Sequence, residues 1–174
     1  AFSLTACGGG DASTNDTAKE EGSSDVITVG FSQVGAESDW RTANSESMKS
    51  TFSTENGYNL IFDDAQQKQE NQLTAIRNFI QQEVDYIVLA PVTESGWDTV
   101  LQEAKDAEIP VIIVDRMVNV SDDSLYTAWV GSNFKLEGQK ACEWLKQYAA
   151  AKNMSEVNIV DIQGTIGASA QIGR

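Results

Sequence analysis

The sequence predicts a doubly wound α/β fold built on a parallel sheet. Two observations support this prediction: apolar runs rich in β-branched residues recur at a spacing of roughly 25 to 30 residues, and amphipathic stretches of helical period lie between them. Strands of a parallel sheet are buried on both faces, so they read as continuous apolar runs. The expected strands are residues 26–31, 59–62, 86–90, 111–114, 125–130 and 157–162.

The helices between these runs are predicted from apolar residues that repeat at i, i+3, i+4 and i+7. In residues 94–105 this stripe consists of Trp97, Val100, Leu101 and Ala104, and the preceding helix has Leu73, Ile76 and Ile80. Ser38 is expected to cap the helix that contains Trp40, and Thr93 or Glu94 is expected to begin the helix after Pro91. Helix starts of this kind direct backbone N–H groups toward one edge of the sheet.

The first 25 residues are expected to be a signal-peptide remnant, a lipidated cysteine and a tether. Leu4-Thr5-Ala6-Cys7 is similar to a bacterial lipobox, in which the peptide is cut before the cysteine and the thiol receives a diacylglycerol. Residues 8–25 contain no large apolar side chain, so they cannot form a core. The alternative is an ordinary exposed Cys7 in a disordered tail. The folded body should begin near Val26.

Composition excludes some function classes. The chain has 26 acidic and 12 basic side chains, no histidine and a net charge of -14, so a nucleic-acid partner is not expected. No apolar run reaches the ~20 residues that span a bilayer, which leaves the lipid as the expected membrane anchor. The second cysteine, Cys142, lies among apolar residues and is expected to be a buried structural thiol. No metal site, cofactor or catalytic residue is predicted.

Polar loops follow the expected strands and predict a binding site, because the carboxyl ends of parallel strands meet at one edge of a sheet. Trp40 offers an aromatic platform, Asp115 is an acceptor, and Arg41, Arg116 and Arg174 are planar donors. Such a set suits a neutral, polyhydroxylated molecule such as a sugar, which has apolar faces and a ring of hydroxyls.

Each of these residues also has a purely structural explanation. Trp40 could belong to the core, Asp115 and Arg116 could form a surface pair, and Glu37 with Asp39 could be a solvated turn. Asp63 and Asp64 are more typical of a helix cap or solvated loop than of a phosphoacceptor site. Residues 164–167 follow an expected strand, but no G-x-G-x-x-G or G-x-x-x-x-G-K-[ST] motif is present, so a nucleotide site is not predicted.

Several segments together resemble the ribose/galactose-type substrate-binding family of sugar ABC transporters, and within it the galactofuranose-binding members. The similarity covers residues 26–174, and the segments that carry it are 29–35, 37–38, 40–41, 66–72, 104–111, 115–116 and 163–169.

This resemblance implies a periplasmic-binding-protein-like type I fold with two lobes, a sugar between them and no cofactor. Residues 26–131 would form lobe one without its returning strands, and residues 132–174 would begin lobe two, with the first crossing near Gly131. The chain starts without Met and stops inside an expected helix, so we expect a fragment that binds sugar poorly by itself. The implied sugar contacts are Glu37, Ser38, Asp39, Trp40, Arg41, Asp115, Arg116 and Arg174. Asp39 departs from the small residue expected there.

The implied function is a lipid-anchored, extracytoplasmic sugar receptor that delivers a monosaccharide to an ABC permease and its ATPase. A sugar-responsive repressor uses a similar effector domain, but residues 8–25 are an acidic tether instead of a basic helix-turn-helix. A glycoside hydrolase would use Glu37 and Asp115 as its carboxylate pair. Arg41 and Arg116 would keep both acids ionised, which removes the proton donor.

Overall fold

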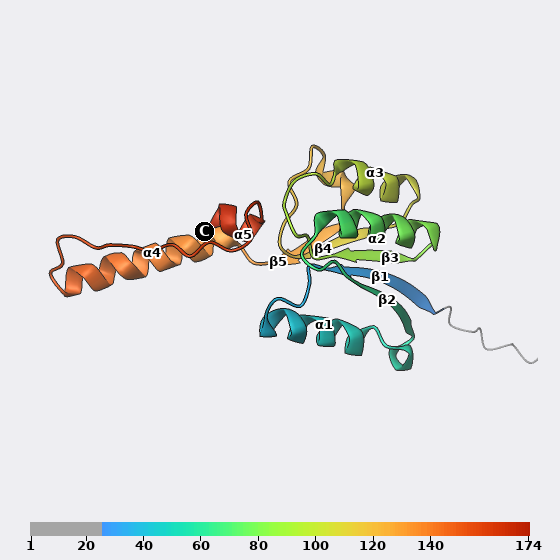
Figure 1. Cartoon of the computed structure of the whole chain (residues 1–174), viewed down its shortest axis with the longest axis horizontal. Helices are drawn as coiled ribbons and strands as arrows, with labels where there is room; N and C mark the ends of the chain where they lie inside the picture. The colour runs from blue at the N-terminus through green and yellow to red at the C-terminus, as the bar shows by residue number, and fades with distance from the viewer. Residues whose placement is uncertain (1–25) are drawn as a thin grey trace, which may run out of the picture.

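The computed structural model describes residues 26–174 and contains a five-stranded, fully parallel sheet in the order β2-β1-β3-β4-β5 (Figure 1). The strand order reverses between β1 and β3, which is the switch point of a doubly wound sheet. The predicted fold class is therefore confirmed. The strands are β1 (Ile27–Gln33), β2 (Tyr58–Asp64), β3 (Tyr86–Leu89), β4 (Val111–Asp115) and β5 (Ala128–Gly131).

Helices cover both faces of the sheet. Helix α1 (Asp39–Thr51) lies on one face, whereas α2 (Gln69–Gln81) and α3 (Asp98–Asp106) lie side by side on the other (Figure 1). The two predicted apolar stripes point inward as expected. All four stripe residues of α3, including the helix-capping Trp97, are fully buried, and Ile76 of α2 packs in the same cluster. The smaller cluster under α1 is centred on Phe31, whose ring meets Phe62 edge to face at 5.7 Å.

After β5 the chain leaves the sheet. Helix α4 (Phe134–Ala151) extends away from it, residues 152–168 run back beside α4, and the short helix α5 (Ser169–Gly173) ends near the sheet (Figure 1). Two hydrogen bonds attach the end of this segment, near residues 167–169, to the carboxyl edge of the sheet. Glu94 N donates to Gly167 O at 2.9 Å, and Met117 N donates to Ser169 Oγ at 2.8 Å. No helix within residues 26–174 is both long and apolar enough to cross a membrane.

The predicted strand at 157–162 is wrong. These residues adopt no regular structure, and Val160 and Ile162 are 87% and 91% exposed. The segment runs beside α4, away from both edges of the sheet, so no strand among residues 26–174 supplies it with backbone partners. A β-branched composition alone cannot make a strand without such a partner.

Two predicted boundaries also move. The third helix begins at Asp98 and not at Thr93 or Glu94, because Gly96 adopts a left-handed φ of 89° and the Trp97 indole donates to Thr93 O at 2.8 Å, which holds residues 93–97 in a turn. The expected strand 125–130 splits into a 3-10 turn at Asp123–Leu125 and the shorter β5.

Cys142 is exposed, so the prediction of a buried thiol is wrong. Its helix, α4, projects from the sheet, and Trp144 on that helix is 63% exposed. An apolar helical face is buried only when another element covers it, and within residues 26–174 this face is largely uncovered. Cys7 and the expected tether lie outside the described residues.

Candidate ligand-binding site

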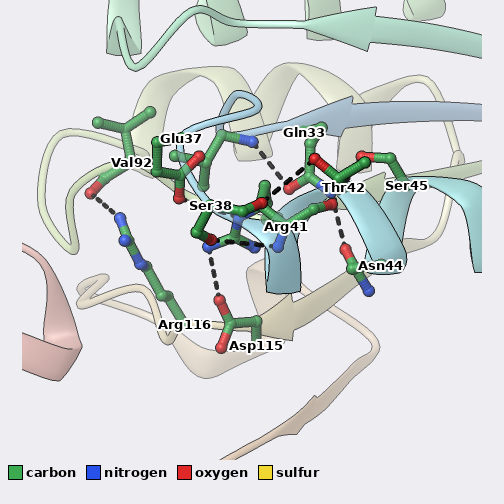
Figure 2. Close-up of polar contacts among 12 residues, drawn as sticks. Gln33, Glu37, Ser38, Arg41, Thr42, Asn44, Ser45, Val92, Asp115 and Arg116 are labelled. Atoms are coloured by element: carbon green, nitrogen blue, oxygen red, sulfur yellow. Dashed lines mark hydrogen bonds and ion pairs between the residues drawn. The ribbon is translucent and has the colours of Figure 1, made fainter.

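The carboxyl edge of the sheet is built from the ends of β1, β3 and β4 and the loops that follow them. Ser38 caps α1 as predicted, since its Oγ accepts from Arg41 N at 3.2 Å. Below it, the fully buried Gln33 at the end of β1 donates to Asn44 Oδ1 at 2.7 Å and Ser45 Oγ at 3.1 Å (Figure 2). The middle of α1 is thereby fixed relative to β1 by side-chain hydrogen bonds. Sequence reasoning missed Gln33, although a glutamine that ends a buried apolar strand was the available signal.

Arg41 is the centre of the site. Its Nε donates to Glu37 Oε1 at 3.1 Å and its Nη2 to Asp115 Oδ2 at 2.9 Å, which joins the β1–α1 loop to the end of β4 (Figure 2). The Arg41 side chain is 3% exposed, whereas the side chains of Glu37 and Asp115 are 23% and 17% exposed. The two carboxylates are therefore the more accessible members of this cluster.

One donor of this cluster remains free. Arg41 Nη1 is buried and has no hydrogen-bond partner among the described residues. A buried, unpaired donor of a charged group is costly, so a ligand oxygen or an ordered water would stabilise it. Asp115 itself has a φ of 62°, a left-handed conformation that aspartate tolerates better than most residues but that still carries strain.

Trp40 lies on the surface beside this cluster. It is 56% exposed, and Arg41 Cζ is 4.9 Å from the centre of its ring. The core explanation for Trp40 is therefore wrong, because the core positions are held by residues such as Trp97. Asp39, the first residue of α1, is exposed, and it forms no side-chain hydrogen bond or ion pair within the described part of the chain.

Arg116 follows Asp115 and links the cluster to a second region. Its Nη1 donates to Val92 O at 3.1 Å, on the loop after β3 (Figure 2). Burial lowers the pKa of Arg116 from its ordinary value, and the positive charge of Arg41 lowers it further, against the opposing effect of Asp115 and Glu37. The guanidinium still carries its charge at neutral pH, because the ordinary pKa of arginine lies far above neutrality.

Arg116 and Arg174 line a small cavity between the sheet's edge and the last described segment. The cavity has a volume of about 150 Å³, below the roughly 300 to 1,000 Å³ of most ligand pockets. Arg174 also pairs with Glu137 at 2.8 Å and lies 4.9 Å over the Phe134 ring. The other polar side chains that line the cavity belong to Asp161, Gln163, Thr165 and Gln171.

The predicted residues thus fall into two groups. Glu37, Arg41 and Asp115 form one cluster, with Trp40 beside it, and Arg174 belongs to the cavity, with Arg116 between the two. Sequence reasoning noticed the loop 163–165 but left it out of the site, and it missed Asp161 and Gln171 entirely. Gln163 and Thr165 come just after the expected strand 157–162, and that place was the available signal. Asp161 lies inside that expected strand and Gln171 lies well beyond it, so neither of them carried this signal. No group of three or more His, Cys, Asp or Glu residues that could hold a metal exists within residues 26–174.

Residues 29–174 match the family model described as periplasmic binding protein domain. The chain belongs to this family. Among the curated relatives of this periplasmic binding protein, the galactofuranose-binding protein YtfQ of Escherichia coli (strain K12) is 49% identical over 148 residues, which are 85% of this chain and 45% of that protein. The fructose import binding protein FruE of Bifidobacterium longum (strain NCC 2705) is 35% identical, over 83% of this chain and 43% of that protein.

Solved structures give the same picture. A Mycobacterium smegmatis protein in complex with β-D-fucofuranose has a TM-score of 0.79 and 50% identity, with 84% of this chain and 48% of that chain covered. The binding protein of an arabinose ABC transporter from Shewanella sp. ANA-3, bound to α- and β-L-arabinofuranose, has a TM-score of 0.76 and 52% identity, with 84% and 47% covered. The chain therefore spans about half the length of the relatives it matches.

Proposed function

We propose that this chain carries the sugar-contacting first half of a substrate-binding protein of a carbohydrate ABC importer, which captures galactofuranose or a related hexose or pentose. The observation that carries the proposal is the Arg41–Asp115 ion pair, which joins the first turn of α1 to the end of β4 directly beside the exposed Trp40. An accessible ring next to partly exposed carboxylates matches the alternating apolar faces and hydroxyl edges of a sugar.

The furanose form of the sugar is the ligand we favour. Three relatives that are 49%, 50% and 52% identical to this chain over the aligned residues are named for galactofuranose, or were solved with fucofuranose or arabinofuranose. A five-membered ring with an exocyclic side chain differs from a pyranose in the direction of its hydroxyls, and directed hydrogen bonds discriminate such differences.

Each residue has a distinct proposed role. Trp40 stacks on the apolar face of the sugar, Glu37 and Asp115 accept hydroxyl protons through their remaining oxygens, and Arg116 donates. Arg41 is mainly committed to the two carboxylates and offers only its unpaired Nη1. Ser38 and Asp39 border this group at the start of α1, and Arg174 would contact the sugar from the opposite side.

The proposed arrangement is a clamp of two lobes. Residues 26–131 form most of lobe one, and residues 132–174 begin lobe two after a crossing near Gly131. Ligand closure requires contacts from both lobes, because only differential affinity for the closed state drives it. The permease and ATPase of the same importer are the proposed partners. The proposed location is outside the cytoplasmic membrane, with a lipid on Cys7 as anchor.

The lipid can be tested apart from the sugar. Expressed in bacteria from its complete gene, the protein should partition into the detergent phase, and Cys7→Ser should move it to the aqueous phase. Mass spectrometry of the mature N-terminus should find a diacylglyceryl group on Cys7. An unmodified Cys7 in the membrane-associated protein would refute the anchor and would leave the sugar proposal untouched.

The sugar is tested by calorimetry on a chain extended to the full length of its relatives. Methyl glycosides are the sharpest probes, because they lock the ring. Methyl β-D-galactofuranoside or methyl arabinofuranoside should bind with a micromolar or lower Kd, and the matching pyranosides at least tenfold more weakly, which corresponds to about 1.4 kcal/mol. Absence of binding by every pentose and hexose tested, in either ring form, would overturn the proposal.

Two exposed tryptophans provide a matched control. Trp40→Ala should weaken binding by tenfold or more, because it removes the stacking platform. Trp144→Ala removes an indole of α4 that has a similar exposure in this chain, and it should leave the Kd unchanged. Equal effects of the two substitutions would contradict the proposed role of Trp40.

A glycoside hydrolase remains the alternative enzyme hypothesis and finds no support in the geometry. Such an enzyme needs one carboxyl group as a proton donor. Glu37 and Asp115 instead both accept hydrogen bonds from the same guanidinium. Incubation of the extended chain with a chromogenic galactofuranoside should release no chromophore.

A further inference from the structure

Gln72 occupies an unusual position for a polar side chain. It lies on the inner face of α2 and is fully buried. Its Nε2 donates to Ala90 O at 2.7 Å and more distantly to Ser32 O at 3.4 Å, while its Oε1 accepts from Val92 N at 2.9 Å. One amide therefore satisfies backbone groups at the end of β1, the end of β3 and the loop after β3.

The Gln72 amide lies at the switch point of the sheet. In doubly wound folds the crevice between the two strands at the reversal is where ligands bind, because the loops diverge there. Here β1 and β3 are those strands, and the Gln72 amide donates to backbone carbonyls at the ends of both. The ion pair of the site lies nearby, between the first turn of α1 and the end of β4.

The hydrogen bonds of Gln72 continue to the site through one residue. Val92 donates its N–H to Gln72, and the carbonyl of the same residue accepts from Arg116 Nη1 at 3.1 Å (Figure 2). The neighbouring loop residue Ser95 is held by Gln69, whose Nε2 donates to Ser95 O at 2.7 Å. The first turn of α2 thus fixes the loop on which the Arg116 guanidinium rests.

We propose that Gln72 is a positioning residue, which holds the Val92 carbonyl in place and through it sets the orientation of the Arg116 guanidinium. A fixed guanidinium donates to a ligand without first losing rotamer freedom, so affinity depends on the preceding hydrogen bond. The part of this inference that concerns sugar affinity rests on the proposed function. The part that concerns the orientation of Arg116 does not.

The first experiment therefore needs no ligand and uses the 174-residue chain. The sequence has four arginines, so single Arg→Lys variants assign their side-chain signals in ¹⁵N-edited NMR spectra. In the unsubstituted protein the Arg116 guanidinium protons should exchange with water at least tenfold more slowly than those of the exposed Arg77. Gln72→Leu should bring the exchange rate of Arg116 close to that of Arg77.

Ile76→Val is the matched control. Ile76 lies one turn along α2, is fully buried and contributes to the same core, but it forms no hydrogen bond with the loop. This substitution should leave the Arg116 exchange rate within twofold of the original. Slow Arg116 exchange retained in folded Gln72→Leu protein would overturn the inference.

Gln72→Glu provides a second variant in case Gln72→Leu does not fold. A protonated glutamic acid can reproduce both the donor and the acceptor of the amide, whereas a carboxylate can only accept and would face the Ala90 carbonyl. Slow exchange of Arg116 should therefore be present at low pH and be lost as the introduced carboxyl ionises. The ratio of the Arg116 and Arg77 guanidinium exchange rates should therefore change with pH. A ratio that is independent of pH would contradict the proposed link from residue 72 through Val92 to Arg116.

The second experiment concerns affinity and uses the extended chain. Gln72→Leu should raise the Kd for methyl β-D-galactofuranoside by about tenfold, and Ile76→Val should not change it. If neither the variant nor the original binds any sugar, the proposed function fails while the NMR result still decides the role of Gln72. Gln72→Leu could speed the exchange of the Arg116 guanidinium protons and still leave the Kd unchanged. That result would show that positioning by Gln72 does not affect sugar affinity, and it would overturn the part of the inference that concerns affinity.

Discussion

Arg41, in the first turn of α1, forms an ion pair with Asp115 at the end of β4, 74 residues further along the chain. Its side chain is almost fully buried, and its positive charge is neutralised by two carboxylates that stay partly accessible. Desolvation of a guanidinium is costly, and paired carboxylates with good geometry offset that cost. The residue is thus better suited to hold Glu37 and Asp115 in place than to bind a ligand through all of its donors.

Arg41→Gln should lower the free energy of unfolding by about 3 kcal/mol, because it leaves Glu37 and Asp115 close together without their cation. Urea unfolding followed by circular dichroism measures the change. Arg77→Gln is the control, since Arg77 also forms two hydrogen bonds with one carboxylate, Glu103, but in solvent. Its effect should be much smaller, as is usual for surface pairs. Equal effects would show that burial does not strengthen the Arg41 contacts.

Asp63 should make stability depend on pH in an unusual direction. Burial raises the pKa of Asp63, its hydrogen bond with Ser32 lowers it, and the charge of Asp64 raises it. A folded-state pKa above the unfolded value means that the ionised carboxyl destabilises the fold at neutral pH. That cost disappears as the pH falls below the unfolded value of about 3.9, where both states are protonated.

Asp63→Asn should therefore raise the urea midpoint at pH 7 and leave it nearly unchanged at pH 3. Asp64→Asn removes the same charge from the exposed neighbour of Asp63 and measures the general effect of net charge. The gain of Asp63→Asn at pH 7 should exceed that of Asp64→Asn. A gain of the same size at both pH values would be inconsistent with the raised pKa.

At the scale of elements, the contact between β4 and β5 couples the candidate site to the segment that leaves the sheet after β5 and begins with α4. Asp115 ends β4 and pairs in register with Gly131, the last residue of β5. A Cβ atom on Gly131 would lie 2.2 Å from the Asp115 carbonyl oxygen and 2.5 Å from Trp129 Nε1. Only glycine permits this close approach, so the backbone that carries the Asp115 carboxylate also limits how the chain leaves the sheet.

Gly131→Ala should push the end of β5 away from Asp115 and destabilise the protein by about 1 to 3 kcal/mol. Gly164→Ala is the control, because a Cβ atom there would meet nothing within 4 Å, and its unfolding midpoint should not change. Amide NMR shifts of residues 115 and 116 should move in the first variant only. Unchanged shifts at both residues would exclude the proposed coupling between β5 and the site.

At the scale of the whole molecule, apolar surface is unevenly distributed. The sheet and its helices bury their stripes well, whereas α4 and the segment beside it leave Trp144, Val160 and Ile162 largely exposed. Exposed apolar side chains of this kind promote association, even though the net charge of -14 opposes it. The chain spans about half the length of the relatives it matches, and closure of a two-lobed clamp needs contacts from both lobes, so this chain by itself should bind sugar weakly and give no heat of tight binding.

The double substitution Val160→Lys with Ile162→Lys should lower the fluorescence of a bound hydrophobic dye and raise the soluble yield of this chain. Both side chains are exposed, so the sheet should keep its unfolding midpoint. Asn158→Lys, on the same exposed segment, adds a charge without removing apolar surface and should leave dye binding unchanged. If the double variant still binds the dye, the exposed apolar surface that binds it does not include Val160 and Ile162.

Most of the architecture could be predicted from the sequence, because its signals are local. The buried stripe of α3, the Ser38 cap and the runs that became β1 to β4 depend on periods and caps within about 15 residues. Residues 157–162 have the same composition, but the strand predicted there does not form. A strand also needs a neighbouring strand to pair with, and the local sequence does not show whether one is present. The prediction that Cys142 is buried failed for a related reason, because burial depends on what covers a helix.

The sequence by itself determined a doubly wound sheet with polar loops at its carboxyl edge, because periodicity and composition are properties of the chain alone. Only the tertiary structure decided which of those polar residues meet: Arg41 with Asp115, Arg116 with Val92, and Gln72 with the ends of two strands. Pairing of this kind depends on distances across the fold, and a linear pattern does not contain them.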